Sequence, residues 1–313
     1  MKCCVIGGTG FIGSHLIQAL LETGRDVLVI GRKEKNRVNL PGGVAYLQGD
    51  VSDAEFIENA LEGVGEIIDL AYSSVPKTSF EDPLNDILSN LPSSVALFNA
   101  ATHFPIKKII YVSSGGTVYG EPLFLPITED HPTNPISPYG ITKLALEKYA
   151  KMYFRIKGLP IVSVRPSNPY GEMQIGFVGQ GFVATAMASV LMQKEIRIFG
   201  ENGTVRDYIY VGDLARAIVA ALEYGSPGEC YNVGTSIGRS NLEVIEEIAV
   251  LAKKNAIEPR ISFMPHRPFD VSANILDAEK LHSVSGWHPL MGFREGIERT
   301  WEWYVSQQAS GQY

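Results

Sequence analysis

A glycine-rich turn close to the N-terminus limits how this chain can fold. A short apolar run at residues 2–6 leads into Gly7, Gly8, Gly10 and Gly13, and an apolar-periodic stretch begins at residue 11. Glycine backbone lets a pyrophosphate approach closely, and the N–H groups and positive dipole end of a following helix stabilise its charge. Because this GxGxxG spacing stands between a predicted strand and a predicted helix, it indicates a dinucleotide-binding turn. The expected cofactor contacts in the turn are Gly7, Gly10, Phe11, Ile12 and Gly13.

Apolar, β-branched runs alternate with stretches of helical periodicity through the first half of the chain. This alternation predicts an α/β fold, in which a doubly wound parallel sheet of the Rossmann type has helices on both faces. The expected strands span residues 2–6, 26–30, 44–47, 66–71, 107–113 and 160–165, and the expected helices span 11–21, 84–101 and 138–156.

Beyond residue 165, glycine and proline become frequent and the periodic segments shorten. Helices are expected near residues 182–193, 212–223, 241–253 and 293–307, with short strands between them. The predicted division is a dinucleotide-binding core at 1–170 and a smaller, mainly substrate-binding part at 171–313, some of whose segments return to the core. In the last helix, Trp301 and Trp303 are expected to serve packing alone.

Composition excludes several classes of protein. Of the 313 residues, 45% are apolar and 19% are charged, as in ordinary globular chains. Lys and Arg number 27 against 34 Asp and Glu, and no basic block appears, so no nucleic-acid partner is expected. No apolar run approaches the roughly 20 residues of a membrane helix, and the first run leads into glycines rather than a cleavage site. We therefore expect a cytoplasmic protein with no membrane partner.

The cysteines and histidines suggest neither disulfides nor a metal. Three cysteines, with Cys3 and Cys4 adjacent in an apolar run, cannot form a disulfide framework and are expected to be buried in a reducing compartment. Six histidines are scattered without an HxxxH or CxxC pair, so no metal site is predicted.

The residues after the second predicted strand bear on the choice of cofactor. An acidic residue usually stands about 20 positions after the glycines to hold the ribose hydroxyls, but here Arg32 and Lys33 follow Gly31. Two cations suit a 2′-phosphate and favour NADP over NAD, unless they are simply exposed loop charges. Asp50 is placed to reach the adenine, or else it caps a helix. Val51 and Ala71 complete the expected cofactor contacts.

Tyr139 and Lys143 stand four residues apart at the start of a predicted helix that Pro138 introduces. Both side chains should therefore point from one helix face. An ammonium beside a phenol favours the phenolate and lowers its pKa, which makes tyrosine a usable base. Such pairs also occur on ordinary helices. The preceding strand, however, ends in Ser113 and Ser114, and ligands collect at that edge of an open sheet.

The whole set of motifs resembles the extended short-chain dehydrogenase/reductases, and within them the nucleotide-sugar epimerases and dehydratases typified by UDP-glucose 4-epimerase. The resemblance covers nearly the whole chain. It rests on GGTGFIG at 7–13, SSGGTVYG at 113–120, SPYGITK at 137–143, RPSNPYG at 165–171 and RDYIYV at 206–211.

The resemblance implies that Tyr139 is the catalytic base and that Lys143 contacts the nicotinamide ribose. A hydroxyl partner is expected four residues before Tyr119, but glycine stands at that position, 115. Either Ser114 or Thr117 then supplies the hydroxyl. The dehydratases carry an Asp-Glu pair just after this position, where this chain has glycine and Thr117, so elimination of water is not expected.

The family likeness also assigns the substrate end. Asn168 and Arg206 resemble the residues that hold the diphosphate of a nucleotide sugar, and Arg267 and Asp270 lie in a segment similar to the family's RPGD. Guanidinium groups suit phosphate oxygens. Phe199 is placed either beside the nucleobase or in the core.

The activity implied is 4-epimerisation of a UDP-hexose or UDP-N-acetylhexosamine, by hydride transfer to and from NAD or NADP through a 4-keto sugar. The alternatives are an NADPH-dependent reductase of nucleotide-4-keto sugars and a noncatalytic dinucleotide-binding regulator. The likeness further implies a homodimer that packs the helices at 84–101 and 138–156 together.

Overall fold

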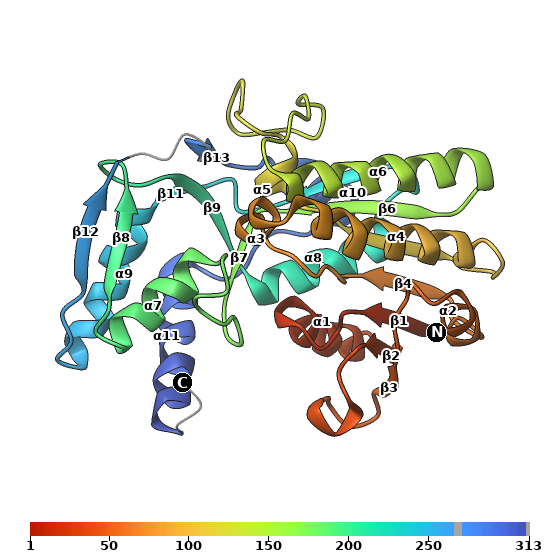
Figure 1. The fold of residues 1–313 in the computed structure, drawn as a ribbon, viewed down its shortest axis with the longest axis horizontal. Coiled ribbons are helices and arrows are strands. Elements are labelled where there is room, and N and C mark those ends of the chain that lie inside the picture. The colour runs from red at the N-terminus through yellow and green to blue at the C-terminus, as the bar shows by residue number, and fades with distance from the viewer. Residues whose placement is uncertain (266–270, 311–313) are drawn as a thin grey trace.

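The computed structural model describes residues 1–265 and 271–310, and a parallel sheet forms its centre (Figure 1). The sheet has seven strands in the order β10-β6-β5-β4-β1-β2-β3, all paired in parallel. The Rossmann-type fold class predicted from the alternation is confirmed. The strands are β1 (Lys2–Ile6), β2 (Asp26–Gly31), β3 (Ala45–Gln48), β4 (Glu66–Asp69), β5 (Lys108–Val112), β6 (Ile161–Pro166) and β10 (Cys230–Val233).

The apolar runs become strands because helices cover both faces of the sheet, so their side chains are buried on either side. Cys3 and Cys4 are fully buried in β1, as expected, and neither forms a disulfide. Every residue of β4 is buried as well. This strand ends two residues earlier than predicted, at Asp69, and Leu70 and Ala71 instead line cavities at the carboxyl edge.

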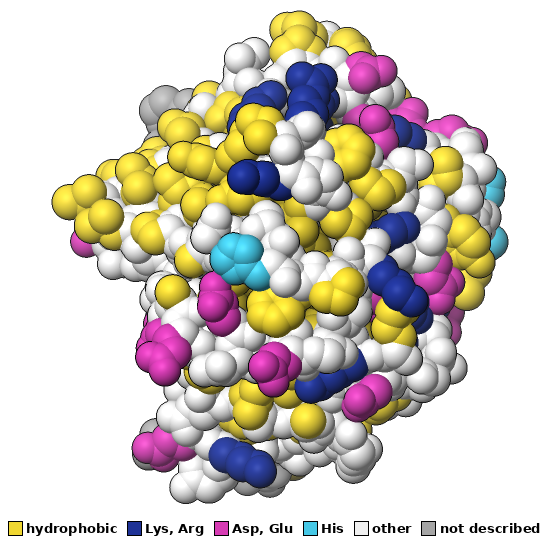
Figure 2. All heavy atoms as spheres, turned by 90° about the vertical axis from the view of Figure 1, so that its right-hand side faces the viewer, with side chains coloured by type: hydrophobic (Ala, Val, Ile, Leu, Met, Phe, Trp, Pro, Cys, Tyr) yellow, Lys and Arg dark blue, Asp and Glu magenta, His cyan; other side chains and the backbone are white. Residues whose placement is uncertain are grey.

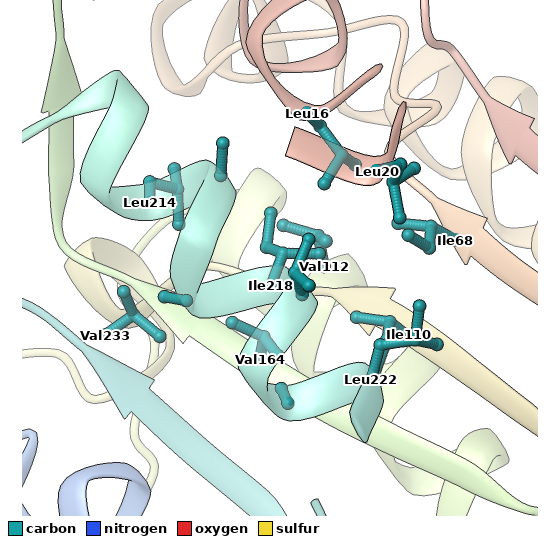
Figure 3. Packing of buried hydrophobic residues seen from close by; sticks show 14 of the residues in the cluster. Leu16, Leu20, Ile68, Ile110, Val112, Val164, Leu214, Ile218, Leu222 and Val233 are labelled. Atoms are coloured by element: carbon teal, nitrogen blue, oxygen red, sulfur yellow. The ribbon is translucent and has the colours of Figure 1, made fainter. Parts of the chain in front are cut away.

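α1 and α8, with α10 (Glu279–Ser285) beside β10, cover one face of the sheet, and three helices cover the other. In Figure 3, Leu16 and Leu20 of the first helix and Leu214 and Ile218 of α8 pack over strand residues such as Ile110. The opposite face buries a second apolar cluster beneath α2, α4 and α6. The bounds are α1 (Phe11–Glu22) and α8 (Val211–Tyr224) on the first face, and α2 (Ala54–Ala60), α4 (Pro83–Ala101) and α6 (Pro138–Lys157) on the second.

The later residues build a smaller part, on the left of Figure 1, while α8 and β10 return to the main sheet. Trp301 is buried in the core of this smaller part and Trp303 packs against it. We retain residues 1–170 and 171–313 as the proposed division. The additional elements are β7 (Asn168–Tyr170), β8 (Glu195–Phe199), β9 (Val205–Tyr210), β11 (Gly238–Ser240), β12 (Arg260–Met264), β13 (Ala273–Asn274), α7 (Phe182–Leu191), α9 (Asn241–Lys254), α10 (Glu279–Ser285) and α11 (Phe293–Ala309).

Two further short helices, α3 (Pro76–Glu81) and α5 (Gly115–Val118), lie near the carboxyl edge of the sheet. Like α2 and α10, they did not emerge from the sequence pattern. Helices this short span too few turns to show a period of 3.6 residues. Over the described residues, no helix combines the length and apolarity needed to span a bilayer.

Candidate active site

A cavity of about 610 Å³ opens where the carboxyl ends of β1, β4 and β5 meet the smaller part. β1 lies between β2 and β4, so the chain runs outward from it in both directions along the sheet. Open α/β sheets bind ligands at such a switch point. The elements that reach this cavity are the glycine turn, the loop after β4, the end of β5, the start of α6, and β7 to β9.

The glycine turn has the geometry that a bound pyrophosphate requires. Gly7 adopts φ +78°, a left-handed conformation that favours glycine. A Cβ on Gly13 would lie 2.5 Å from the Gly8 Cα atom, so the start of α1 packs directly on the turn. No side chain caps α1 and no acidic residue stands in its first turn. Its positive end, with Phe11 and Ile12, therefore faces the cavity and is suited to an anion.

A second cavity, of about 320 Å³, continues from the first across the glycine turn. Gly7 and Tyr72 line both cavities. The cofactor contacts predicted after the glycine turn and before α6 all line the smaller one, namely Arg32, Lys33, Asp50, Val51 and Ala71.

Asp50 does not cap a helix. The N-cap of α2 is Asp53, whereas Asp50 accepts hydrogen bonds from the Ser52 backbone at 2.9 Å and from its hydroxyl at 2.8 Å. These bonds, and to a smaller extent the positive charge of Arg32, lower the pKa of Asp50. The carboxylate is therefore kept ionised at the wall of the smaller cavity.

Lys143 is almost completely buried and points at the end of β5. Ser137 caps the N-terminus of α6, Pro138 begins the helix, and Lys143 follows within two turns. Its Nζ atom donates a hydrogen bond to the Val112 carbonyl at 2.8 Å. Burial lowers the pKa of Lys143 to about 8, although the carboxylates of Asp69, Glu147 and Asp86 raise it.

Tyr139 does not have the lowered pKa that its spacing from Lys143 predicts. Burial raises the pKa of Tyr139, and a hydrogen bond with the Ser114 side chain offsets only part of this effect. The Lys143 Nζ atom lies 5.8 Å from the Tyr139 ring centroid and is also hydrogen-bonded to the Val112 carbonyl. In this structure, desolvation of the phenol therefore outweighs the neighbouring ammonium.

The structure distinguishes between the two candidate hydroxyl partners. The Ser114 side chain lowers the pKa of Tyr139, whereas the Thr117 hydroxyl donates to the Ser114 carbonyl at 3.4 Å. Ser113 is not available, because its hydroxyl donates to Glu147 at 2.5 Å. Of the two candidates, Ser114 is therefore the hydroxyl that acts on the phenol.

The glycine at position 115 has a steric cause. A Cβ there would lie 2.5 Å from a methyl carbon of Leu276 and 3.0 Å from the Arg165 carbonyl oxygen. The same atom on Gly116 would meet nothing closer than Asn168, at 3.7 Å. A hydroxyl side chain does not fit at position 115 without displacing Leu276.

A buried ion pair supports this end of the sheet, and the sequence motifs did not reveal it. Arg165 donates to both carboxylate oxygens of Glu147, at 2.9 and 2.6 Å. Its third bond goes to the Tyr119 hydroxyl at 2.7 Å. Since Glu147 lies one turn beyond Lys143 on α6, the pair holds the half of this helix that carries Lys143 against β6.

The predicted substrate residues line the far side of the large cavity. Asn168 and Arg206 face it from β7 and β9, and Phe199 from the end of β8. The Asn168 amide donates to the Asp207 carbonyl at 3.2 Å, which joins these two strands. The remaining predicted residues, Arg267 and Asp270, lie outside the described residues.

Several cavity residues were not foreseen from the sequence. Ser167 and Gln174 each carry a buried oxygen without a hydrogen-bond partner in the described structure. Unpaired buried oxygens are uncommon, and at a cavity wall they suit a polar ligand. Ser167 and Tyr208 stand inside the motifs at 165–171 and 206–211, which gave them no role of their own. No motif includes the further cavity residues Gln174, Tyr72, Ser74, Arg197 and Asn241.

Within residues 1–265 and 271–310, no group of His, Cys, Asp and Glu side chains is arranged to hold a metal ion.

Known proteins share both the sequence pattern and this architecture. The model of the NAD dependent epimerase/dehydratase family matches residues 3–234. The UDP-glucose 4-epimerase of Mycolicibacterium smegmatis is 34% identical, over 97% of this chain and 98% of its own. Among solved structures, the UDP-glucose 4-epimerase of Thermotoga maritima with UDP-glucose has a TM-score of 0.91 at 32% identity, covering 98% of this chain and all of that one. The Thermus thermophilus UDP-glucose 4-epimerase in complex with NAD has a TM-score of 0.88 at 34% identity, covering 97% and 99%.

Proposed function

The chain belongs to the NAD dependent epimerase/dehydratase family, and on that premise we propose that it is an NAD(P)-dependent 4-epimerase of UDP-sugars. One observation carries the proposal. A single cavity is lined by the glycine turn, by the Ser114, Tyr139 and Lys143 side chains, and by Asn168 and Arg206. A sugar bound between these groups has a proton acceptor and a dinucleotide site beside it, and its diphosphate has cationic and amide partners.

The cofactor contacts follow from the two cavities. Gly7, Gly10 and the start of α1 face the pyrophosphate, the residues around Arg32 and Asp50 face the adenosine, and Lys143 faces the nicotinamide ribose. A nicotinamide dinucleotide held by these residues would supply the hydride acceptor and donor for carbon 4 of the sugar.

Tyr139 removes the proton from the sugar 4-hydroxyl. Because burial raises the pKa of Tyr139, formation of its phenolate depends on nearby positive charge, which Lys143 supplies as an ammonium. Ser114 donates to the phenolate oxygen and fixes its position. On return of the hydride, Tyr139 gives the proton back to the sugar.

The substrate is bound through its diphosphate, which takes no part in the reaction. Arg206 and Asn168 bind the diphosphate, and we assign Arg267 and Asp270 to the same end. Binding energy placed on the diphosphate leaves the 4-keto sugar free to turn and present its opposite face. Inversion at carbon 4 follows from this arrangement.

A reductase of nucleotide-4-keto sugars is the second candidate, because Arg32 and Lys33 line the adenosine cavity and suit NADPH. The two activities differ in cofactor use, since an epimerase regenerates its cofactor in every cycle and a reductase consumes it.

The test is to incubate the purified protein with UDP-glucose, UDP-galactose and their N-acetylamino forms without added cofactor, and to follow the products by NMR. Interconversion of a 4-epimeric pair supports the proposal. Turnover of a 4-keto sugar only when NADPH is added would identify the reductase instead. Absence of either reaction, with the dinucleotide still bound, would indicate the noncatalytic regulator.

We further propose that the protein is a homodimer formed through α4 and α6. These helices expose apolar side chains on one surface of the molecule, among them Leu84, Ile87 and Leu88 of α4, and Ile141, Tyr149, Met152 and Ile156 of α6. Figure 2, which faces the right-hand side of Figure 1, has hydrophobic side chains gathered in its upper part, where these helices lie. Light scattering that gives the mass of one chain would exclude the dimer.

A further inference from the structure

Tyr72 lies at the junction of the two cavities and is in contact with both Lys143 and Tyr139. The Lys143 Nζ atom stands 4.1 Å from the Tyr72 ring centroid, nearer than its 5.3 Å to the Tyr111 ring and its 5.8 Å to the Tyr139 ring. The ring of Tyr139 meets that of Tyr72 edge to face, with centroids 4.8 Å apart. One aromatic side chain therefore contacts the ammonium and the phenol that the reaction needs.

We propose that Tyr72 is a positioning residue, whose ring face holds the charged Lys143 side chain and whose edge fixes the ring of Tyr139. The inference deepens the proposed function and rests on it for the reaction concerned. Tyr72 stands on the loop between β4 and α3, outside the sequence motifs that resemble the family.

The buried carboxylate of Asp86 keeps Tyr72 in place. Asp86, on α4, is 0% exposed and accepts a hydrogen bond from the Tyr72 hydroxyl at 3.3 Å. It also accepts one from Thr142, the neighbour of Lys143 on α6, at 2.7 Å, and another from Ser74. The loop that carries Tyr72 is thereby tied to the helix that carries Lys143.

Asn90 reinforces this anchor one turn along α4. Its side-chain oxygen accepts from the Ser73 backbone at 2.7 Å, and its amide nitrogen donates to the Asp86 carbonyl at 2.7 Å. The backbone of the loop and the Tyr72 hydroxyl are thus both fixed on α4. The position of the ring over Lys143 is consequently set by buried hydrogen bonds, which disfavour other rotamers.

The ring face is important because the ammonium is almost free of water. The charged and titratable groups that face Lys143 are Asp69 from β4, Asp86 from α4, Glu147 and Tyr139 from α6, Tyr111 from β5, and Tyr72. The three carboxylates act at a distance, whereas the Tyr72 ring is in contact. Attraction between a cation and an aromatic face is strongest where both are desolvated. The ring therefore favours the charged form of Lys143 and opposes the effect of burial.

The test uses the protein in the presence of NAD. The protein is produced in cells supplied with lysine that carries carbon-13 at Cε. The Cε resonance of Lys143, assigned by its loss in Lys143→Met, reports its titration without any substrate. For wild type the midpoint is expected at about pH 8. Tyr72→Phe keeps the ring and the bond from the Ser73 backbone to Asn90 that holds the loop, so it leaves the midpoint within about 0.3 pH units, whereas Tyr72→Leu lowers it by about one unit.

Activity supplies the second readout. With UDP-galactose, the alkaline limb of the kcat profile in Tyr72→Leu moves to lower pH together with the lysine midpoint, and Tyr72→Phe retains the wild-type profile. The exposed Tyr224→Leu is the matched control and changes neither quantity. If Tyr72→Leu does not fold, Tyr72→Met replaces it.

An unchanged lysine midpoint in Tyr72→Leu, or the same shift in Tyr72→Phe, would overturn the proposal. Failure of the proposed function is recognised separately, because wild-type protein would then not interconvert UDP-sugars at any pH. The lysine titration would still decide whether the Tyr72 ring holds Lys143 in its charged form.

Discussion

The side chains of Ser114, which follows β5, and of Tyr139, at the start of α6, line the same cavity, and the Ser114 side chain lowers the pKa of the Tyr139 phenol. The two residues stand on segments that approach the cavity from different directions. Because burial raises the same pKa, Ser114 offsets part of the effect of burial on Tyr139. The proton-transfer step proposed here depends on this pair.

Replacement of Ser114 by alanine is expected to lower kcat about 10- to 100-fold, because one hydrogen bond to the developing phenolate is lost. Thr117→Ala is the matched control, since its hydroxyl contacts only the Ser114 carbonyl among the bonds observed, at 3.4 Å. Steady-state rates with UDP-galactose provide the measurement. A larger loss in Thr117→Ala than in Ser114→Ala would reverse the assignment.

Introducing serine at position 115 is expected to destabilise the fold rather than to add a useful hydroxyl. Its Cβ would lie 2.5 Å from Leu276, and such overpacking typically costs about 1–3 kcal/mol. The corresponding change at Gly116 meets its nearest atom at 3.7 Å and should cost less. Urea unfolding of Gly115→Ser and Gly116→Ser compares the two. Equal free energies of unfolding would show that Leu276 does not restrict this position.

The cofactor preference is expected to favour NADP(H), with a lower dissociation constant than NAD(H). Arg32 and Lys33 line the adenosine cavity, and charge-assisted hydrogen bonds to a 2′-phosphate strengthen binding. Arg32→Ala should weaken NADP binding about tenfold and change NAD binding much less. Calorimetry on the cofactor-free proteins measures the dissociation constants of NADP and NAD for both wild type and Arg32→Ala. Tighter binding of NAD by wild type would reject the preference.

Asp207 should make the stability of the protein decrease as the pH rises. Burial raises the pKa of this fully buried carboxyl to about 6, although hydrogen bonds from Thr235 and Ser236 lower it. Between about pH 4 and 6 the folded chain retains a proton that the unfolded chain has lost, so the free energy of unfolding falls by roughly 3 kcal/mol over this range.

The Asp207 contribution is isolated by subtraction. Urea unfolding at pH 4, 5, 6 and 7 gives the free energies of unfolding of wild type and Asp207→Asn. In the difference between the two at each pH, the contributions of the other titrating groups cancel. We expect the free energy of unfolding of the variant, minus that of wild type, to increase up to pH 6 and then to level off. A difference independent of pH would mean that Asp207 is ionised in the folded protein throughout.

The sequence was most informative for features that are determined by residues close together in the chain. The spacing of Gly8, Gly10 and Gly13, and of Tyr139 and Lys143, is set within one turn or one helix. The six strands expected in the first half of the chain followed from the alternation because both faces of the sheet are buried, whereas the short helices α2, α3, α5 and α10 were not predicted. These features require no knowledge of what lies opposite in space.

Other features depend on contacts between distant segments, which no local pattern encodes. The choice of Ser114 over Thr117 results from the approach of α6, and the glycine at 115 is explained by Leu276, far along the chain. The pKa of Tyr139 was mispredicted for the same reason, since burial is a tertiary property. Asp86 and Tyr72 likewise stand in no recognisable motif.

The most direct test of the proposed chemistry is the exchange of UDP-galactose and UDP-glucose by wild-type protein and by Tyr139→Phe, followed by proton NMR, with UDP binding measured in parallel. The phenol oxygen is the only atom of Tyr139 that this substitution removes. We expect turnover to fall by about a thousandfold or more while the dissociation constant of UDP changes less than about threefold. If Tyr139→Phe retains most of the wild-type rate, Tyr139 is not the base and the proposed mechanism is wrong.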